Sequence, residues 1–217
     1  MFTGIVEAIG KVEAVSPAGQ TAAVRVACDG LDLSDVAIGD SISVNGVCIT
    51  VKVVGKDSID FDVSAETLGV TAGFRRDERV NLEKSLRLDT RIGGHLVSGH
   101  VDGIGEVIAR NPAARAIQFS VRAPDELARY IAHKGSICVD GTSLTVNAVN
   151  GAVFELTIVP HTLQETIMDE YQPGRMVNLE VDLIARYLER LLLGDRAADP
   201  LAKGVSMELL AEHGFIK

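Results

Sequence analysis

The stretch Ser41–Val51 reads SISVNGVCITV, and Ser136–Val146 reads SICVDGTSLTV. In each stretch a turn-forming pair, Asn45-Gly46 or Asp140-Gly141, interrupts a run of residues that favour strands. Asn-Gly and Asp-Gly pairs tolerate the positive φ angles that a two-residue hairpin turn requires. Both stretches are therefore predicted to be β-hairpins, and their similarity indicates that the chain repeats itself.

A second pair of matching segments has the same spacing. Residues 2–12 (FTGIVEAIGKV) correspond to residues 97–107 (VSGHVDGIGEV), and the offset of 97 − 2 = 95 also relates the two hairpins. The tetrapeptide VNLE at residues 80–83 recurs at residues 177–180, an offset of 177 − 80 = 97 that implies a two-residue insertion in the second copy. Such a register indicates a tandem duplication of units of about 90 residues.

Short runs of roughly alternating polarity fill the rest of each unit, for example at residues 21–28, 58–68, 116–121 and 152–159. Such runs are typical of strands. About six strands joined by tight turns favour a small closed barrel, because closure removes the exposed edges of an open sheet. The predicted fold class is all-β, with one small barrel in each unit, and a β-sandwich is the alternative.

Three segments have helical patterns. Ala123–Glu126 places a proline and two acids where a short helix would begin, and Gly135 would end it. A last short helix is predicted from Ser206 to Gly214. Between them, residues 183–194 have the pattern of an amphipathic helix that ends at Gly194.

The apolar stripe of this amphipathic helix leaves two interpretations open. It consists of Ile184, Tyr187, Leu188, Leu191 and Leu192, and Arg186, Glu189 and Arg190 lie opposite. In the first interpretation, the stripe packs on the chain's own barrels. In the second, it packs against the same helix of other chains, because the first unit contains no such helix.

Composition and charge narrow the class of protein. The chain has 217 residues, with 21 Lys and Arg against 30 Asp and Glu, a net charge of −9 that is typical of a soluble globular protein. An acidic chain without a basic cluster repels phosphate backbones and anionic lipids, so we expect no nucleic-acid or membrane partner. No apolar run approaches the roughly 20 residues that span a bilayer, and a signal peptide is not indicated. We expect a cytoplasmic protein.

The cysteines and histidines do not predict a metal site. Cys28, Cys48 and Cys138 are widely spaced without a CxxC pair, so neither a disulfide framework nor a zinc ribbon is indicated. His95 and His100 have no third ligand nearby.

Positions at which the two copies differ are candidates for chemistry. Cys48 corresponds to Ser143 in the hairpins, and Ile5 corresponds to His100 in the leading segments. A histidine suits proton transfer near neutral pH. The alternatives are a small buried cysteine and a structural histidine. A row of groups that suits a polyol recurs near the end of each unit: Asp62, Ser64, Glu66 and Thr67, then Thr157, Val159, His161 and Thr162.

The motifs MFTGIV, NGVCITV, AETL, GGHLVSGHVDG, DGTSLTV, VPHTL and VNLEVD, in this order, resemble those of riboflavin synthase, the trimeric family that dismutates lumazine. The resemblance covers essentially the whole chain. It implies two six-stranded antiparallel Greek-key barrels, each binding one 6,7-dimethyl-8-ribityllumazine, and C-terminal helices that join three chains. It also implies an active site between the N-terminal barrel of one chain and the C-terminal barrel of a neighbour.

The reaction that the resemblance implies joins two lumazines. Four-carbon transfer gives riboflavin and 5-amino-6-(D-ribitylamino)uracil, the last step of riboflavin biosynthesis, with no metal or organic cofactor. We expect His100, with Ser143 or Thr145, to assist proton removal from the C7 methyl group or to stabilise the carbanion. Cys48 is expected to assist nucleophilic addition, and Phe2 to close over the rings.

The resemblance also implies the substrate contacts. In the first barrel they are Gly4, Ile5, Val6, Cys48, Ile49, Thr50, Asp62, Val63, Ser64, Ala65, Glu66 and Thr67. In the second barrel they are Gly99, His100, Val101, Lys134, Ser143, Leu144, Thr145, Thr157, Ile158, Val159, Pro160, His161 and Thr162.

The predicted domains are two lumazine-binding barrels at residues 1–90 and 91–182, followed by helices for trimerisation and a tail at residues 183–217. Association with lumazine synthase is a further partner to consider. The alternative function is a non-catalytic lumazine- or flavin-binding protein of the fluorescent type, in which the second site is degraded. The hairpin and threonine motifs are present in both copies, which favours the enzyme. A structural scaffold would not require diverged polar residues at equivalent turns.

Overall fold

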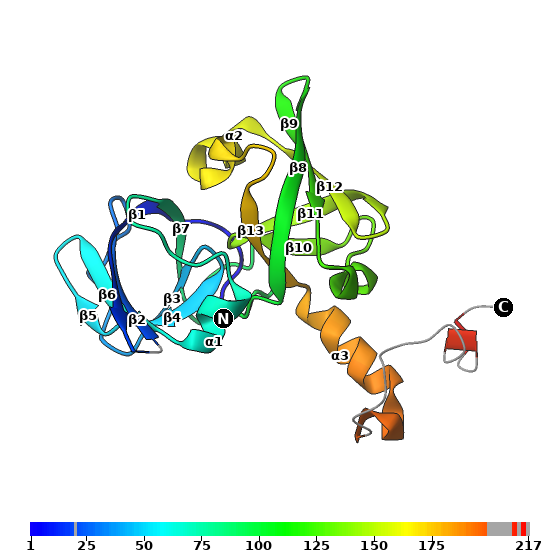
Figure 1. The fold of residues 1–217 in the computed structure, drawn as a ribbon, viewed down its shortest axis with the longest axis horizontal. Coiled ribbons are helices and arrows are strands. Elements are labelled where there is room, and N and C mark those ends of the chain that lie inside the picture. The colour runs from blue at the N-terminus through cyan, green and yellow to red at the C-terminus, as the bar shows by residue number, and fades with distance from the viewer. Residues whose placement is uncertain (20, 199–209, 212–213, 216–217) are drawn as a thin grey trace.

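The computed structural model describes residues 1–217 except 20, 199–209, 212–213 and 216–217 (Figure 1). Two β-structured units lie side by side, and a helix follows the second (Figure 1). The first unit comprises β1 (Ala8–Ala18), β2 (Thr21–Ala27), β3 (Ser41–Val44), β4 (Val47–Thr50), β5 (Val53–Val54), β6 (Ser58–Val63), α1 (Ala65–Val70) and β7 (Arg79–Lys84). The second comprises β8 (Gly103–Ala113), β9 (Ala116–Arg122), η1 (Asp125–Tyr130), β10 (Ser136–Val139), β11 (Thr142–Asn150), β12 (Val153–Ile158), α2 (Pro160–Glu165), η2 (Ile167–Glu170) and β13 (Met176–Val181). The helices α3 (Leu183–Leu192) and η3 (Gly194–Ala198) follow.

The second unit is a closed barrel of six strands in the order β10-β11-β12-β9-β8-β13. Neighbouring strands are antiparallel throughout, and β13 returns to β10, where Glu180 pairs with Cys138. A closed ladder excludes the β-sandwich. The predicted barrel is therefore confirmed for this unit.

The first unit is a curved sheet of seven strands in the order β4-β3-β7-β1-β2-β6-β5. The strand that is continuous in the second unit as β11 is divided here into β4 and β5 by Val51 and Lys52. At the corresponding place, β11 has a bulge between Val146 and Ala148. The two ends of the sheet meet where β4 leads into β5, and Lys52 N donates to Asp60 O at 2.8 Å. This unit differs from the predicted barrel by one broken strand.

Both predicted hairpins are present, and their turns touch. Asn45 and Asp140 have φ angles of 49° and 43°, and Gly46 and Gly141 follow at 77° and 80°, as a two-residue turn of this type requires. A Cβ atom on Gly46 would lie 2.7 Å from the backbone nitrogen of Gly141, and the reverse distance would be 2.8 Å. Because only glycine allows this approach, the sequence of the turns determines how closely the two units meet.

Each unit has its own hydrophobic core. Phe61 and Ile42 are buried in the first core, and Phe119 and Phe154 in the second. Burial of apolar surface is the main stabilising contribution to folding, so each unit has the interior of a domain. A third, small cluster joins the units; it consists of Phe2, Val97 and Cys138, with Cys48 packed against it.

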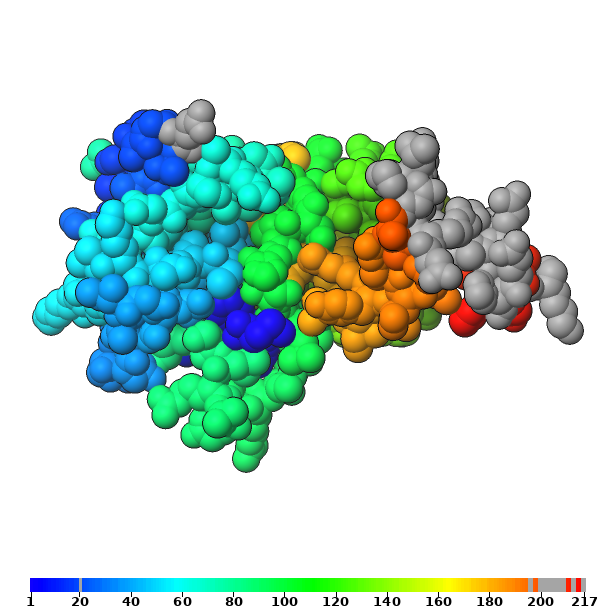
Figure 2. All heavy atoms as spheres, turned by 90° about the horizontal axis from the view of Figure 1, so that it is seen from below, coloured from blue at the N-terminus to red at the C-terminus, as the bar shows by residue number. Residues whose placement is uncertain are grey.

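The amphipathic helix is α3, and its polar face contacts the second barrel. Arg186 Nη2 donates to the Asp102 carboxylate at 2.6 Å and to His100 O at 2.9 Å, and Glu189 accepts a hydrogen bond from the Tyr130 hydroxyl. The interpretation in which the apolar stripe packs on the chain's own barrels is therefore wrong. The stripe is 53% to 75% exposed at Ile184, Tyr187, Leu188 and Leu191. In Figure 1, α3 leads away from the barrels, and in Figure 2 its orange spheres lie at the surface of the molecule.

The ends of α3 agree with the sequence prediction. The Asp182 carboxylate accepts from Ile184 N at 3.0 Å and caps α3, which ends just before Gly194. The predicted helix after Ala123 is the 3-10 helix η1, which ends at Tyr130, before the predicted end at Gly135, because the backbone of Ile131 is extended. The helix predicted from Ser206 falls mostly outside the described residues. Within the described part of the chain, no helix is long and apolar enough to cross a membrane.

Candidate active site

The segment that precedes the first strand of each unit crosses the boundary between the units. We call residues 2–6 and 97–101 the leading segments. They pair with each other at Phe2 and Val97, whose backbones exchange hydrogen bonds of 2.7 and 3.0 Å. This pairing brings the start of each unit to the hairpin of the other.

Each leading segment rests on a hairpin at a glycine. Ser143 N donates to Gly4 O at 2.7 Å, and Cys48 N donates to Gly99 O at 2.8 Å. Gly4 and Gly99 have φ angles of 73° and 79°, and a Cβ atom on either would lie 2.6 Å from the Cβ of the residue it faces. Two equivalent arrangements result, one around Cys48 and one around Ser143.

We call residues 48–50 with 99–101 the Cys48 half-site, and residues 143–145 with 4–6 the Ser143 half-site. The resemblance had grouped residues 4–6 with the first barrel and residues 99–101 with the second. In the structure, the backbone of each leading segment pairs with the hairpin of the other barrel. Comparison of the copies could not show this, since equivalent positions do not reveal whether contacts form within or between copies.

Buried carboxylates hold both leading segments. Glu180 of β13 accepts hydrogen bonds from Ser98 N, Ser98 Oγ, Gly99 N and His100 N at 2.7 to 3.0 Å. Glu83 of β7 accepts from Thr3 N, Thr3 Oγ1 and Gly4 N at 2.7 to 3.0 Å. Both were missed as functional candidates, although the recurrence of VNLE in the two copies was a signal.

Ser143 has a histidine partner that the sequence did not predict. His95 Nδ1 and Ser143 Oγ are 2.7 Å apart, and burial lowers the pKa of His95 below its usual value. The neutral ring that results can accept the serine proton. His95 Nε2 is buried without a hydrogen-bond partner in the structure. In the sequence, His95 stands out only as one of two histidines without a third metal ligand nearby, so its bond to Ser143 has no sequence signal.

His100 is next to the glycine that contacts Cys48. Its side chain is exposed, its N–H donates to Glu180 at 3.0 Å, and its carbonyl accepts from Arg186 at 2.9 Å. The Cys48 side chain is partly buried and packs against the cluster of Phe2, Val97 and Cys138. The backbone of His100 is therefore fixed on both sides while its imidazole faces the surface, as a group available to a ligand.

The predicted role of Phe2 as a cover over the rings does not agree with the structure. Its side chain has no exposed surface and packs against Val97 and Cys138 between the barrels. Phe2 therefore contributes to the boundary between the units, and its influence on the half-sites comes through the backbone of its leading segment.

The two polyol rows end β6 and β12 and continue into α1 and α2. Ser64 Oγ caps α1 by accepting from Thr67 N at 3.1 Å, and Asp62 pairs with Lys52 at 2.8 Å, so part of this row has structural partners. In the second row, α2 begins at Pro160 without a side-chain cap. The side chains of Thr157, Val159 and His161 are exposed, as are those of Thr50, Thr145 and Lys134.

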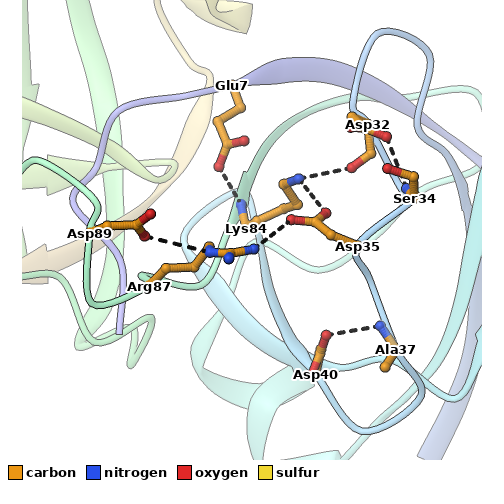
Figure 3. A network of polar contacts seen from close by, with 9 residues as sticks. All are labelled: Glu7, Asp32, Ser34, Asp35, Ala37, Asp40, Lys84, Arg87 and Asp89. Atoms are coloured by element: carbon orange, nitrogen blue, oxygen red, sulfur yellow. Dashed lines mark hydrogen bonds and ion pairs between the residues drawn. The ribbon is translucent and has the colours of Figure 1, made fainter.

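A cavity of about 620 Å³ lies beside the Ser143 half-site, and Ile5 is the predicted contact residue that lines it. Its wall is held by ion pairs at the end of β7 (Figure 3). Lys84 Nζ lies 2.7 Å from the Asp35 carboxylate, which also pairs with Arg87 at 3.4 Å, and Lys84 N donates to Glu7. The network joins the loop that contains Asp35 to β7, so it shapes this wall.

Two segments of the chain match one protein family. Residues 3–85 and 98–182 each match the lumazine binding domain. Over their full lengths, the chain is 50% identical to the riboflavin synthase of Photobacterium phosphoreum and 47% identical to that of Photobacterium leiognathi, with 100% of each chain covered. The riboflavin synthase of Bacillus subtilis is 36% identical over 99% of this chain and 100% of its own. This chain belongs to the riboflavin synthase family.

Solved structures share the fold of this riboflavin synthase family member. LumP complexed with riboflavin superposes with a TM-score of 0.78 at 21% identity, covering 83% of this chain and 99% of LumP. LumP complexed with 6,7-dimethyl-8-(1′-D-ribityl) lumazine gives 0.75 at 20% identity over the same shares. At this identity the likeness concerns the fold alone.

Proposed function

We propose that this protein is a riboflavin synthase that dismutates two molecules of 6,7-dimethyl-8-ribityllumazine to riboflavin and 5-amino-6-(D-ribitylamino)uracil without a metal or organic cofactor. The observation that carries the proposal is the pair of half-sites in one chain. Both have the same backbone frame, with a glycine carbonyl bound to a hairpin N–H, while the facing residues are Cys48 in one and Ser143 in the other. The relatives at 36% to 50% identity are riboflavin synthases.

The chemistry requires two similar sites with different side chains. The two substrates are identical, so each needs the same backbone frame, but one lumazine loses a C7 methyl proton while the other is attacked at C7. His100 and the Ser143–His95 pair supply groups for proton transfer. Cys48 assists the nucleophilic addition to the other lumazine. Holding two rings together also lowers the entropic cost of their reaction, so positioning contributes strongly to the rate.

We further propose that three copies associate through α3, as the family resemblance implies. The apolar stripe of α3 is exposed at Ile184, Tyr187, Leu188 and Leu191 in the single chain. The polar face of α3 already has partners on the barrel, so the stripe is left for other chains. In such an assembly the active site lies between the N-terminal barrel of one chain and the C-terminal barrel of a neighbour, as the family resemblance implies. The cysteines are free thiols, in keeping with a reducing compartment such as the cytoplasm.

The test is to mix the purified protein with 6,7-dimethyl-8-ribityllumazine and no added cofactor, and to follow riboflavin absorbance and fluorescence. One riboflavin formed for every two lumazines consumed is the expected result. Tight binding without turnover would instead identify a non-catalytic lumazine carrier, the second candidate. His133→Gln is a suitable control for His100→Gln, because both histidine side chains are exposed.

A further inference from the structure

Glu83 and Glu180 are buried acids whose partners are backbone and hydroxyl groups. Their exposures are 5% and 2%, and within the described residues neither carboxylate forms an ion pair with a Lys, Arg or His. A buried charge without a cation is costly unless several donors satisfy it. Here the leading segments supply the donors. Each segment is consequently held by charge-assisted hydrogen bonds, which are stronger than neutral ones.

The leading segments lie between these carboxylates and the hairpins. On one side, Gly99 N donates to Glu180 at 2.9 Å; on the other, Gly99 O accepts from Cys48 N at 2.8 Å. The next residue, His100, also donates its N–H to Glu180. One carboxylate therefore sets the backbone position of His100 and the glycine contact to Cys48. Glu83 has the same relation to Gly4 and, through Gly4, to Ser143.

The two copies differ in one bond. Glu180 reaches the N–H of His100 at 3.0 Å, whereas the N–H of Ile5, the equivalent residue, donates to Thr3 Oγ1 at 3.2 Å. The copy that carries a histidine thus has a direct bond from carboxylate to that residue. This difference is expected if Glu180 positions a group that takes part in the reaction.

We propose that Glu180 and Glu83 are positioning residues, Glu180 for the Cys48 half-site and Glu83 for the Ser143 half-site. Each holds the leading segment of its own barrel against the hairpin of the other. The proposal deepens the proposed function, because it assigns the geometry of each half-site to one buried carboxylate. It also means that a substitution at one carboxylate changes the geometry of one half-site and leaves the other as it is.

The experiment measures Cys48 thiol reactivity in the full chain, which does not depend on catalysis. Cys28 and Cys138 are 2% and 1% exposed, whereas Cys48 is partly exposed, so a chromogenic disulfide reagent reports on Cys48 in the folded protein. Glu180→Gln is compared with Glu83→Gln, the same change in the other copy. The amide nitrogen of glutamine cannot accept from the backbone N–H groups, so the leading segment loses part of its support.

Glu180→Gln is expected to raise the rate of Cys48 modification about fivefold, while Glu83→Gln leaves it within about twofold of wild type. Equal acceleration in both variants, or a rate for Glu180→Gln equal to that of wild type, would overturn the proposal. Circular dichroism and the number of thiols that react exclude global unfolding. If either glutamine variant does not fold, Ser98→Ala and Thr3→Ala remove the hydroxyl donor to each carboxylate, and the same contrast is expected at a smaller size. Thr3→Ala also removes the acceptor of Ile5 N, which lies in the Ser143 half-site, so it still should not change the Cys48 rate.

The lumazine assay gives the second readout. Both glutamine variants are expected to lower kcat about tenfold with a smaller change in KM, because they displace reacting groups more than they remove substrate contacts. An unchanged kcat in an active wild-type background would overturn the proposal. A wild-type protein that forms no riboflavin would refute the proposed function instead, and the thiol rates would still decide whether each carboxylate holds its own half-site.

Discussion

Asn81 and Asn178 make the same hydrogen bond in opposite directions across the boundary between the barrels. Asn81 Nδ2 donates to Asp140 O, and Asn178 Nδ2 donates to Asn45 O, each at 2.8 Å. Asn178 Oδ1 also accepts from Ala72 N at 2.7 Å. Both asparagines are buried, and each satisfies backbone groups of the other barrel that are buried or partly buried.

Replacing Asn178 with alanine is expected to lower the free energy of unfolding by about 2 kcal/mol, because it leaves the buried carbonyl of Asn45 and the partly buried N–H of Ala72 unpaired. Urea denaturation followed by circular dichroism measures the change. Lys11→Ala is the control: it breaks an ion pair with Asp77 in which both side chains are more than half exposed, and should cost less than about 1 kcal/mol. Similar losses in the two variants would contradict the structural role of Asn178.

The turn of the second hairpin carries an acid that the first lacks. Asp140 accepts from Asn178 N at 2.7 Å and from the Tyr171 hydroxyl, and it is buried. In the first barrel, Asn45 occupies the position equivalent to Asp140. The repeat offset of 97 residues makes Phe74 the equivalent of Tyr171, because 171 − 97 = 74. Burial raises the pKa of Asp140 to about 6.

This pKa gives the protein a pH dependence with a definite sign. Because the folded carboxyl group has a pKa of about 6 and the unfolded one about 3.9, the folded state binds more protons between these values. The contribution of Asp140 to stability is therefore present at low pH and is lost as pH rises from about 4 to about 6. The double variant Asp140→Asn/Tyr171→Phe, which copies the first barrel, should lack this loss.

Thermal unfolding at intervals from about pH 4 to pH 7 measures the difference between the double variant and wild type. The Tm of the variant should rise relative to that of wild type across this range. Asp140→Asn alone is the matched control, since it removes the titration but changes the bond to Tyr171, so its Tm should be lower throughout with the same relative trend. A constant difference between the double variant and wild type would contradict the assignment.

The sequence predicted the barrels because the repeat and the strand pattern are local properties. The offset of 95 residues placed both hairpins, and the turn pairs at Asn45 and Asp140 have the predicted conformation. The break between β4 and β5 was not predictable, because Val51 and Lys52 are residues that a continuous strand accepts equally well. At the equivalent place in the second copy, β11 continues with a bulge.

The parts of the site that sequence did not predict depend on contacts between units. The exchange of leading segments at Gly4 and Gly99 leaves no signal in a comparison of the copies. The bond from His95 to Ser143 joins residues 48 positions apart that have no motif in common. The orientation of α3 was left open because amphipathicity shows which residues share a face; it does not show which face the chain itself covers.

Cys48→Ser and His100→Gln test the roles assigned to two side chains of the Cys48 half-site. Each is expected to lower kcat for lumazine dismutation by up to about 100-fold, because it removes a group that assists the reaction. Lumazine binding should be retained, because the backbone frame that holds the rings does not change. Stopped-flow absorbance gives kcat, and fluorescence titration with 6,7-dimethyl-8-ribityllumazine gives lumazine binding. If both variants kept the wild-type kcat with intact binding, neither side chain would have a catalytic role.

The exposed stripe of α3 predicts the effect of polar substitutions on assembly. Leu188→Gln/Leu191→Gln is expected to reduce the mass measured by sedimentation velocity from three chains to one, because these side chains are 53% and 75% exposed in the single chain and have no role in its core. Lys56→Gln, in the turn before β6 with a side chain 94% exposed, serves as the control. An unchanged mass in the leucine variant would rule out assembly through this stripe.

Arg186 connects α3 to the Cys48 half-site. Its guanidinium bonds both to the Asp102 carboxylate and to the carbonyl of His100, so the same residue that fixes the helix on the barrel also fixes the backbone of His100. Arg186→Leu should therefore lower kcat about tenfold even where sedimentation shows an unchanged mass. Arg190→Leu, an exposed position on the same helix, should leave kcat at the wild-type value. A loss of activity that always accompanied a loss of mass would mean that Arg186 acts through assembly, because a direct effect on His100 does not require the chains to separate.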